Sequence, residues 1–427
     1  MGNRSSTSIQ QAPPTGPPAL LSAAVRGDLK KFRESWTNNE EAAIHVKDAQ
    51  KNNCLHALFS CRSIENENNC LEILNDIHNS LSDLQVKEAY REKNTIGCTP
   101  LWILVAYGNV KLLKKVQQIL FADEDDNDDD GDGDGDDDDD DDQKNKKNKD
   151  DDFSTMLCIP NNQGDTPFLA TCSQGNIDMI QFLKEEILTS DQFNRALTEA
   201  NQKGTTPLQI IVGNHHIELL QYVLQEQGSN SVLHDQLLMS NTAGLSLFHI
   251  CSERNAHAIL QKLFTYNIVI QNQKTTTINN NNEEEEDYYI AALEQILSLK
   301  DKNGANALHV AAFCGNFETV QLWIDMINSN NKSEYSDDVT NKTSSQSQSS
   351  KKSTIVIDML DKLDGQGRTA YWLGMVQGHD TIGKLLAEEG VDTVHPKMVK
   401  EVTEAKEKRS NKQQTRAVDG SALLSKQ

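Results

Sequence analysis

Residues 301–325 read DKNGANALHVAAFCGNFETVQLWID, a sequence in which turn residues separate two short apolar segments. The segment from Asp301 to Gly304 predicts a tight turn, because Asp side chains favour turns and Gly tolerates a positive φ. Ala305–Cys314 predicts a short apolar helix that ends at Gly315. A second predicted helix follows, whose apolar residues recur at helical spacing: Phe317, Val320, Leu322 and Trp323. Two helices this short cannot bury their apolar faces alone, so we expect the unit to stack on copies of itself.

Copies of this unit recur along the chain. With Gly304 as position zero, the pattern has Asn or Asp at −3, Leu or an aromatic residue at +4, and Gly or Asn near +11. Four further units fit the pattern, and their zero positions are Gly97, Gly164, Gly244 and Gly367. Three units fit it in part, and their zero positions are Gly204, which has His215 at +11, Lys51, which lacks the glycines, and Gly16, which lacks the −3 residue. The sequence therefore predicts eight units between residues 16 and 390.

Two other positions of the unit carry polar residues with a structural explanation. Thr-Pro pairs precede the first helix in three units: Thr99-Pro100, Thr166-Pro167 and Thr206-Pro207. A threonine hydroxyl accepts from an unpaired N–H at the helix start, and proline there has no N–H to leave unpaired. Three units share a histidine position: His56, His249 and His309. Stacked units hold such side chains roughly 10 Å apart, too far to bind one metal ion, so we expect each imidazole to bond the backbone of the adjacent turn.

Together these motifs resemble the ankyrin repeat, whose consensus carries T-P-L-H-x-A over about 33 residues. The matching segments are CLHAL from Cys54, LFHIC from Leu247 and ALHVAA from Ala307. The spacing departs from the consensus, since Gly164, Gly204 and Gly244 are 40 residues apart. Almost all extra residues follow the second helix, where insertions lengthen surface loops. The resemblance covers most of residues 16–390 and implies an all-α ankyrin-repeat solenoid of about eight helix-turn-helix units.

An ankyrin-like array implies a non-catalytic scaffold or adaptor that holds protein partners on its concave surface. The alternative is a dedicated regulator, inhibitor or assembly chaperone of a single enzyme or complex. The sequence carries no G-x-S-x-G, H-E-x-x-H, P-loop or kinase motif, and the repeats account for the ordered residues. We therefore expect no enzyme and predict no catalytic, cofactor-binding or metal-binding residues. Trp102, Trp323 and Trp372 are expected to pack in the core, with a binding role on the concave side as the alternative.

Composition shifts divide the chain into repeats and polar segments. The predicted segments are a disordered arm at 1–15, ankyrin-like repeats at 16–122, an Asp/Lys-rich insertion at 123–152, further repeats at 153–327 with an Asn/Glu-rich loop at 271–287, a Ser/Asn-rich insertion at 328–354, the last repeat at 355–390, and a polar tail with a frayed helix at 391–427. The insertions combine low hydrophobicity with high polarity, so we expect them to be disordered.

The acidity of the chain belongs mainly to one insertion. The net charge is −23, and the run from Asp123 to Asp142 holds 16 acidic residues, which leaves −7 for the rest. Asp126–Gly131 matches the first half of a calcium-binding loop, but such a match is nearly automatic in an aspartate run. Weak, diffuse cation binding is therefore the stronger expectation. The chain has no basic stripe with interleaved aromatics, so we expect no nucleic-acid partner.

The cysteines and the hydropathy of the chain indicate the cellular compartment in which we expect the protein. The eight cysteines include no C-x-x-C pair, and several occupy apolar helix positions, which predicts free thiols in a reducing compartment. The chain has no 18-residue apolar run and no N-terminal apolar segment typical of a secretory signal. We therefore expect a cytoplasmic protein, in part associated with membranes for the reason that follows.

The N-terminus, MGNRSS, resembles the N-myristoylation signal M-G-x-x-x-[ST], with Gly2 as the acceptor and Ser6 at the hydroxyl position. The alternative is an unmodified tail that begins with glycine by chance. A single myristoyl chain gives only marginal, reversible membrane binding. The first 20 residues hold one basic residue, Arg4, and no cysteine, so they supply no second anchor. A myristoylated chain would therefore divide between cytosol and membrane.

Replacing Gly2 by Ala should move the membrane-bound fraction into the cytosol, because the variant lacks the acceptor glycine. The measurement is the intact mass of the N-terminal peptide from cells, together with fractionation of the wild-type chain and the variant. A free or acetylated N-terminus, with unchanged fractionation of Gly2→Ala, would show that Gly2 is not myristoylated.

Overall fold

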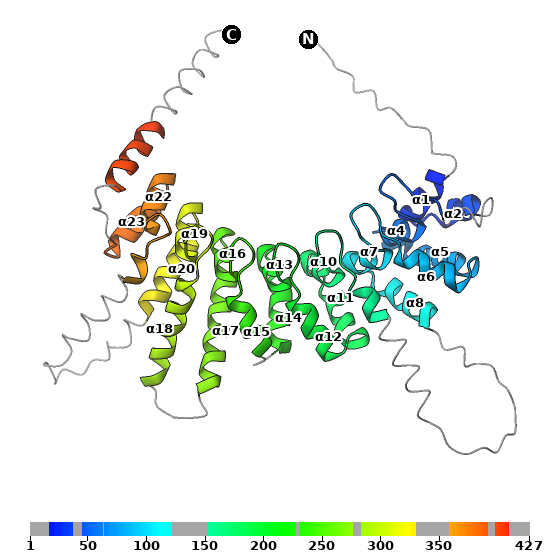
Figure 1. The fold of residues 1–427 in the computed structure, drawn as a ribbon, viewed down its shortest axis with the longest axis horizontal. Helices are drawn as coiled ribbons and strands as arrows, with labels where there is room; N and C mark the ends of the chain where they lie inside the picture. The colour runs from blue at the N-terminus through cyan, green and yellow to red at the C-terminus, as the bar shows by residue number, and fades with distance from the viewer. Residues whose placement is uncertain are drawn as a thin grey trace, which may run out of the picture. The chain divides into compact units, whose positions relative to one another are not determined.

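The computed structural model describes residues 17–36, 45–62, 64–121, 153–227, 231–275, 283–329, 358–391 and 398–409. All regular elements in these ranges are helices, and the ranges contain no strand, so the predicted all-α class is confirmed. The chain divides into two compact parts, Met1–Gln202 and Lys203–Gln427. Figure 1 shows helices α1 to α12 of the N-terminal part and α13 to α23 of the C-terminal part.

Several predicted segments lie outside the described residues. They are Gly2 with the arm 1–15, the Asp/Lys-rich insertion 123–152 with its calcium-loop match, most of the Ser/Asn-rich insertion 328–354, and residues 410–427 of the tail. The predictions made for them stay predictions.

The described residues of the N-terminal part contain four helical pairs. The first helices of these pairs are α1 (Pro17–Arg26), α4 (Cys54–Phe59), α7 (Pro100–Tyr107) and α10 (Pro167–Gln174). The second helices are α2 (Leu29–Trp36), α5 (Glu67–Asn79), α8 (Val110–Phe121) and α11 (Ile177–Phe182). First helices pack on first helices in chain order, and second helices pack on second helices in the same order. The part is therefore two layers of helices, with the apolar core between and within them.

Shorter elements complete the N-terminal part. A single turn of 3-10 helix, η1 (Ile64–Asn66), leads into α5, and a π-helical turn, η2 (Leu183–Ile187), continues α11. Two additional helices follow the second helices of their pairs, α6 (Asp83–Arg91) and α12 (Ser190–Thr198), so the extra residues there are in part helical. Residues 153–157 also form a helical turn, which the sequence reasoning did not predict.

The described residues of the C-terminal part likewise contain four helical pairs. The first helices are α13 (Pro207–Gly213), α16 (Leu247–Glu253), α19 (Ala307–Cys314) and α22 (Ala370–Gln377). The second helices are α14 (Ile217–Gln227), α17 (His257–Thr275), α20 (Phe317–Asn328) and α23 (Asp380–Glu388). Two further helices, α15 (Ser231–Leu238) and α18 (Glu283–Ser298), pack against α17. Figure 1 shows α17 and α18 as the two longest helices of this part, lying side by side.

The predicted loop at 271–287 is wrong over most of its length. Helix α17 continues to Thr275, and α18 begins at Glu283, so only residues 276–282 remain outside the described helices. The segment contains neither Gly nor Pro to end a helix. Its four consecutive glutamates, Glu283–Glu286, fall in the first turn of α18, where the positive end of the helix dipole stabilises negative charge.

The predicted polar tail contains a helix that closes the C-terminal part. Residues 398–409 are helical, and the Arg409 guanidinium donates to two carbonyl oxygens in the last turn of α22, at 2.9 and 3.1 Å. One pair earlier, the ring of His379 makes the equivalent contact, with its Nε2 atom 3.2 Å from the Phe313 carbonyl oxygen. The helix 398–409 therefore covers the end of α22, as the next pair does elsewhere.

Replacing Leu308 by Ala should lower the free energy of unfolding by about 2–5 kcal/mol. The Leu308 side chain is 1% exposed and lies on α19, which packs against α16 and α22. Urea unfolding measures the loss, and the exposed Lys302→Ala variant, expected to change stability by less than about 0.5 kcal/mol, is the control. A loss below about 0.5 kcal/mol for Leu308→Ala would show that this position is not part of the core.

Candidate functional site

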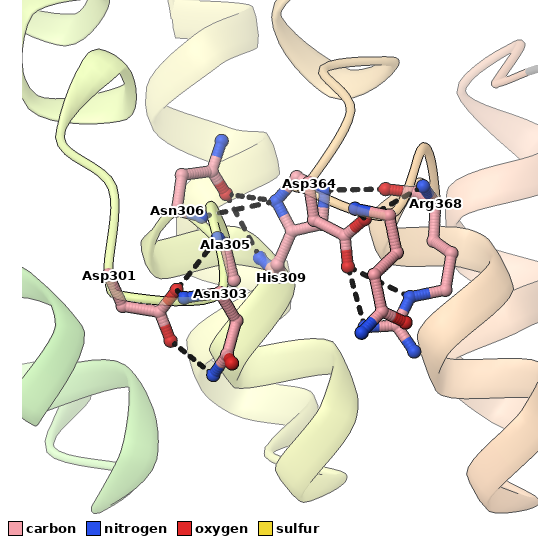
Figure 2. A network of polar contacts seen from close by, with 8 residues as sticks. Asp301, Asn303, Ala305, Asn306, His309, Asp364 and Arg368 are labelled. Atoms are coloured by element: carbon pink, nitrogen blue, oxygen red, sulfur yellow. Dashed lines mark hydrogen bonds and ion pairs between the residues drawn. The ribbon is translucent and has the colours of Figure 1, made fainter.

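The turn before each first helix is the most regular feature of the described residues. In the turn before α19, Asp301 Oδ1 accepts hydrogen bonds from the backbone N–H groups of Asn303 and Ala305, each at 2.8 Å (Figure 2). The same pair of bonds recurs in five other turns, which begin at Asp48, Asn94, Asn161, Asn241 and Asp364. The predicted structural role of these Asn and Asp residues is therefore confirmed.

One backbone hydrogen bond joins each such turn to the next within each part. In the N-terminal part the donors and acceptors are Thr95 to Gln50, Asn162 to Ile96, and Gln202 to Gln163, at 2.8–3.1 Å. In the C-terminal part they are Thr242 to Lys203, Lys302 to Ala243, and Gly365 to Asn303, at 2.9–3.1 Å. The turns approach so closely that a Cβ atom on Gly304 would lie 2.5 Å from the Gly365 nitrogen. Glycine at this position is therefore required by the contact as well as by its φ of +74°.

The three histidines at the shared position reach across to the following turn. His309 Nε2 lies 3.0 Å from the Arg368 carbonyl oxygen, and its Nδ1 lies 2.6 Å from Asn306 Oδ1 and 3.4 Å from the backbone nitrogen of Asn306 (Figure 2). Both ring nitrogens of His309 therefore lie against an oxygen atom, one in the following turn and one at the start of its own helix. His56 and His249 make the same contact with the carbonyl oxygens of Cys98 and Ala305, each at 3.0 Å. The predicted bonds from these imidazoles to the neighbouring turns are confirmed.

Burial keeps these imidazoles neutral. It is the largest cause of the lowered pKa of His56, His249 and His309, and it outweighs the hydrogen bonds to the carbonyl oxygens, which raise each pKa. At Asp364, burial raises the carboxyl pKa, but hydrogen bonds from the side chain and backbone of Arg368 outweigh it, so the pKa is lowered. Among the described residues, no group of three or more His, Cys, Asp or Glu side chains is placed to hold a metal ion. The polar residues of the turns bond their own backbone and the neighbouring turns.

The tryptophans and cysteines belong mostly to the core. Trp323 and Trp372 are buried, and Trp323 Nε1 donates to Ser252 Oγ at 3.0 Å. Trp102 is half-buried and donates to the Asp165 carbonyl oxygen at 2.8 Å, so it also joins neighbouring pairs. All eight cysteines are free thiols: Cys54, Cys61, Cys70, Cys98, Cys172 and Cys251 are buried, and Cys158 and Cys314 are exposed.

A polar groove in the N-terminal part is the feature that the sequence reasoning missed. It has a volume of about 590 Å³. It lies at the connections between the first and second helices of three successive pairs, α4/α5, α7/α8 and α10/α11. On its wall the Arg62 guanidinium carbon is 4.4 Å from the centroid of the Tyr107 ring. Lys111 Nζ pairs with Glu67 Oε2 at 2.6 Å. The one signal in the sequence was Arg62 itself, which stands at +11 where most units carry Gly or Asn.

None of the helices in the described ranges is both long enough and apolar enough to cross a membrane.

Stability should fall as the pH is lowered below about 6.5, the usual pKa of an unfolded histidine. Because burial lowers the folded pKa values, the unfolded chain binds more protons below that pH. The contribution is therefore complete above pH 6.5 and is lost toward the folded pKa, by up to about 1.4 kcal/mol per pH unit for each histidine. Urea unfolding of His309→Gln should show a flatter pH dependence, whereas the exposed His257→Gln should follow the wild type. An unchanged slope in His309→Gln would contradict the neutral, buried imidazole.

No protein-family model matches this chain, and no curated protein matches it. The repeated turns, the contacts between them and the groove are therefore the basis for assigning its function.

Proposed function

We propose that this chain is a non-catalytic scaffold or adaptor for protein partners, built on about eight ankyrin-like repeats. The observation that carries the proposal is the repeated turn, with its Asn or Asp side-chain bonds and its single backbone bond to the next turn. The Thr-Pro starts support the likeness, because the hydroxyls of Thr99, Thr166 and Thr206 each accept from the backbone N–H three residues on, at 3.1–3.4 Å.

A rigid row of turns suits recognition of proteins. The tips carry exposed side chains, which are Lys51, Ile96 and Gln163 in the N-terminal part and Thr242, Lys302 and Gln366 in the C-terminal part. Their backbone is already fixed by the bonds between turns, so a partner would bind without the cost of ordering a loop. The internal polar residues, by contrast, are used in the turns and in contacts between pairs. This division favours binding through the tips over chemistry.

Two variants at the tips test the proposal in the full chain. Ile96, which is 60% exposed, is replaced by Asp, and Lys302 by Glu. At least one variant should reduce recovery of co-purifying proteins from cells about tenfold, because exposed anchors contribute most of the binding energy at an interface. Urea unfolding of both variants should match the wild type within about 0.5 kcal/mol.

The number of partners separates the scaffold from its alternative. Several proteins recovered at different ratios indicate a scaffold or adaptor, and one protein at a fixed ratio indicates a dedicated regulator or assembly chaperone. Recovery of nothing above a bare-bead control, from a chain that unfolds cooperatively, would overturn the interaction function itself.

A further inference from the structure

The residues of the groove beside Arg62 indicate which kind of partner the chain binds, and this inference rests on the proposed function. Arg62 is exposed in the connection between α4 and α5, the first pair of helices that line the groove, and its guanidinium lies over the Tyr107 ring. Stacking on an aromatic face leaves the N–H groups at the edge of the guanidinium available. No described residue gives the Arg62 side chain a hydrogen-bond acceptor or an ion-pair partner. The side chain is therefore held in place with its donors unused.

Arg33, in the same part of the chain, shows the contrast. Its Nε atom donates to Asp76 at 2.7 Å, and its guanidinium also reaches Glu72 at 3.2 Å. A guanidinium with free donors in a groove is matched by a planar carboxylate, which accepts two parallel N–H bonds. Tyr107 is 40% exposed, so it offers apolar contact beside that carboxylate. Arg and Tyr are the residue types that most often dominate binding at protein interfaces.

The charges that line the groove favour a ligand with no more than one negative charge. The Lys111 ammonium is neutralised by its pair with Glu67, and Asp178 adds a negative charge on the third helical pair. A phosphate group carries about −1.5 to −2 at neutral pH and would be repelled by the Asp178 carboxylate. A carboxylate side chain meets this repulsion only weakly, because it needs no more than the one guanidinium. The volume, about 590 Å³, fits a short peptide segment rather than a folded domain.

We propose that this groove binds an Asp or Glu side chain on a short segment of a partner protein, with Arg62 as the bidentate donor and Tyr107 as the adjoining apolar contact. The surrounding amides, such as Gln174, line the path of the flanking backbone. The site uses residues from three successive pairs, so it exists only when those pairs are stacked.

The test places a photo-crosslinking residue, p-benzoylphenylalanine, at the exposed position Gln174 of the full chain. After irradiation in cells, mass spectrometry identifies the peptide attached to position 174. We expect a peptide from another protein with Asp or Glu close to the crosslink. Adding Arg62→Gln should reduce the crosslinked product about tenfold, and Arg62→Lys, which keeps the charge without the planar fork, should give an intermediate loss. The matched control is Arg26→Gln, which removes an exposed arginine that does not line the groove.

The other outcomes overturn the inference in distinguishable ways. A product that persists in Arg62→Gln, or that carries a phosphorylated peptide or no acidic residue, would show that Arg62 is not a carboxylate site. A crosslink to the acidic run of this same chain would replace the partner by an internal ligand. If no crosslink forms at position 174 while proteins still co-purify through the turn tips, the proposed binding at the groove is wrong. The proposed scaffold function is then unaffected.

Discussion

A single backbone hydrogen bond between successive turns sets the geometry of both parts of the chain. Each turn first satisfies its own N–H groups with an Asn or Asp side chain, as Asp301 does at 2.8 Å. The turn is then rigid enough to present one N–H and one carbonyl to its neighbours. Glycine at Gly304 and its equivalents allows the close approach. Stability in such an arrangement depends on the interface between adjacent pairs more than on any pair alone.

The buried histidines reinforce these interfaces and also make them sensitive to their surroundings. Each imidazole crosses from the start of one helix to the carbonyl of the following turn, as His309 does toward Arg368. In His56 and His309, one ring nitrogen faces this carbonyl and the other faces an Asn side-chain oxygen, so each ring contacts two neighbours. Burial lowers the pKa of each ring and so favours its neutral form.

Local chemistry explains which features the sequence predicts. The turns, the threonine caps and the histidine bridges follow from residues a few positions apart, so Thr166, Gly304 and His309 could be placed without a structure. The helices at 283–287 and 398–409 were harder, because polar composition resembles that of disorder, and Arg409 gains its place only from carbonyls of α22. The groove could not be predicted from the sequence for a similar reason. Arg62 and Tyr107 are far apart in sequence and meet only when their pairs stack.

The helix at 398–409 has a consequence for assembly. A stack of similar pairs is an open template, since the last turn of each first helix offers carbonyl oxygens that the following pair covers. Arg409 occupies those oxygens at the end of α22. A further helical pair or a second copy of the chain could bond these two oxygens only by displacing Arg409.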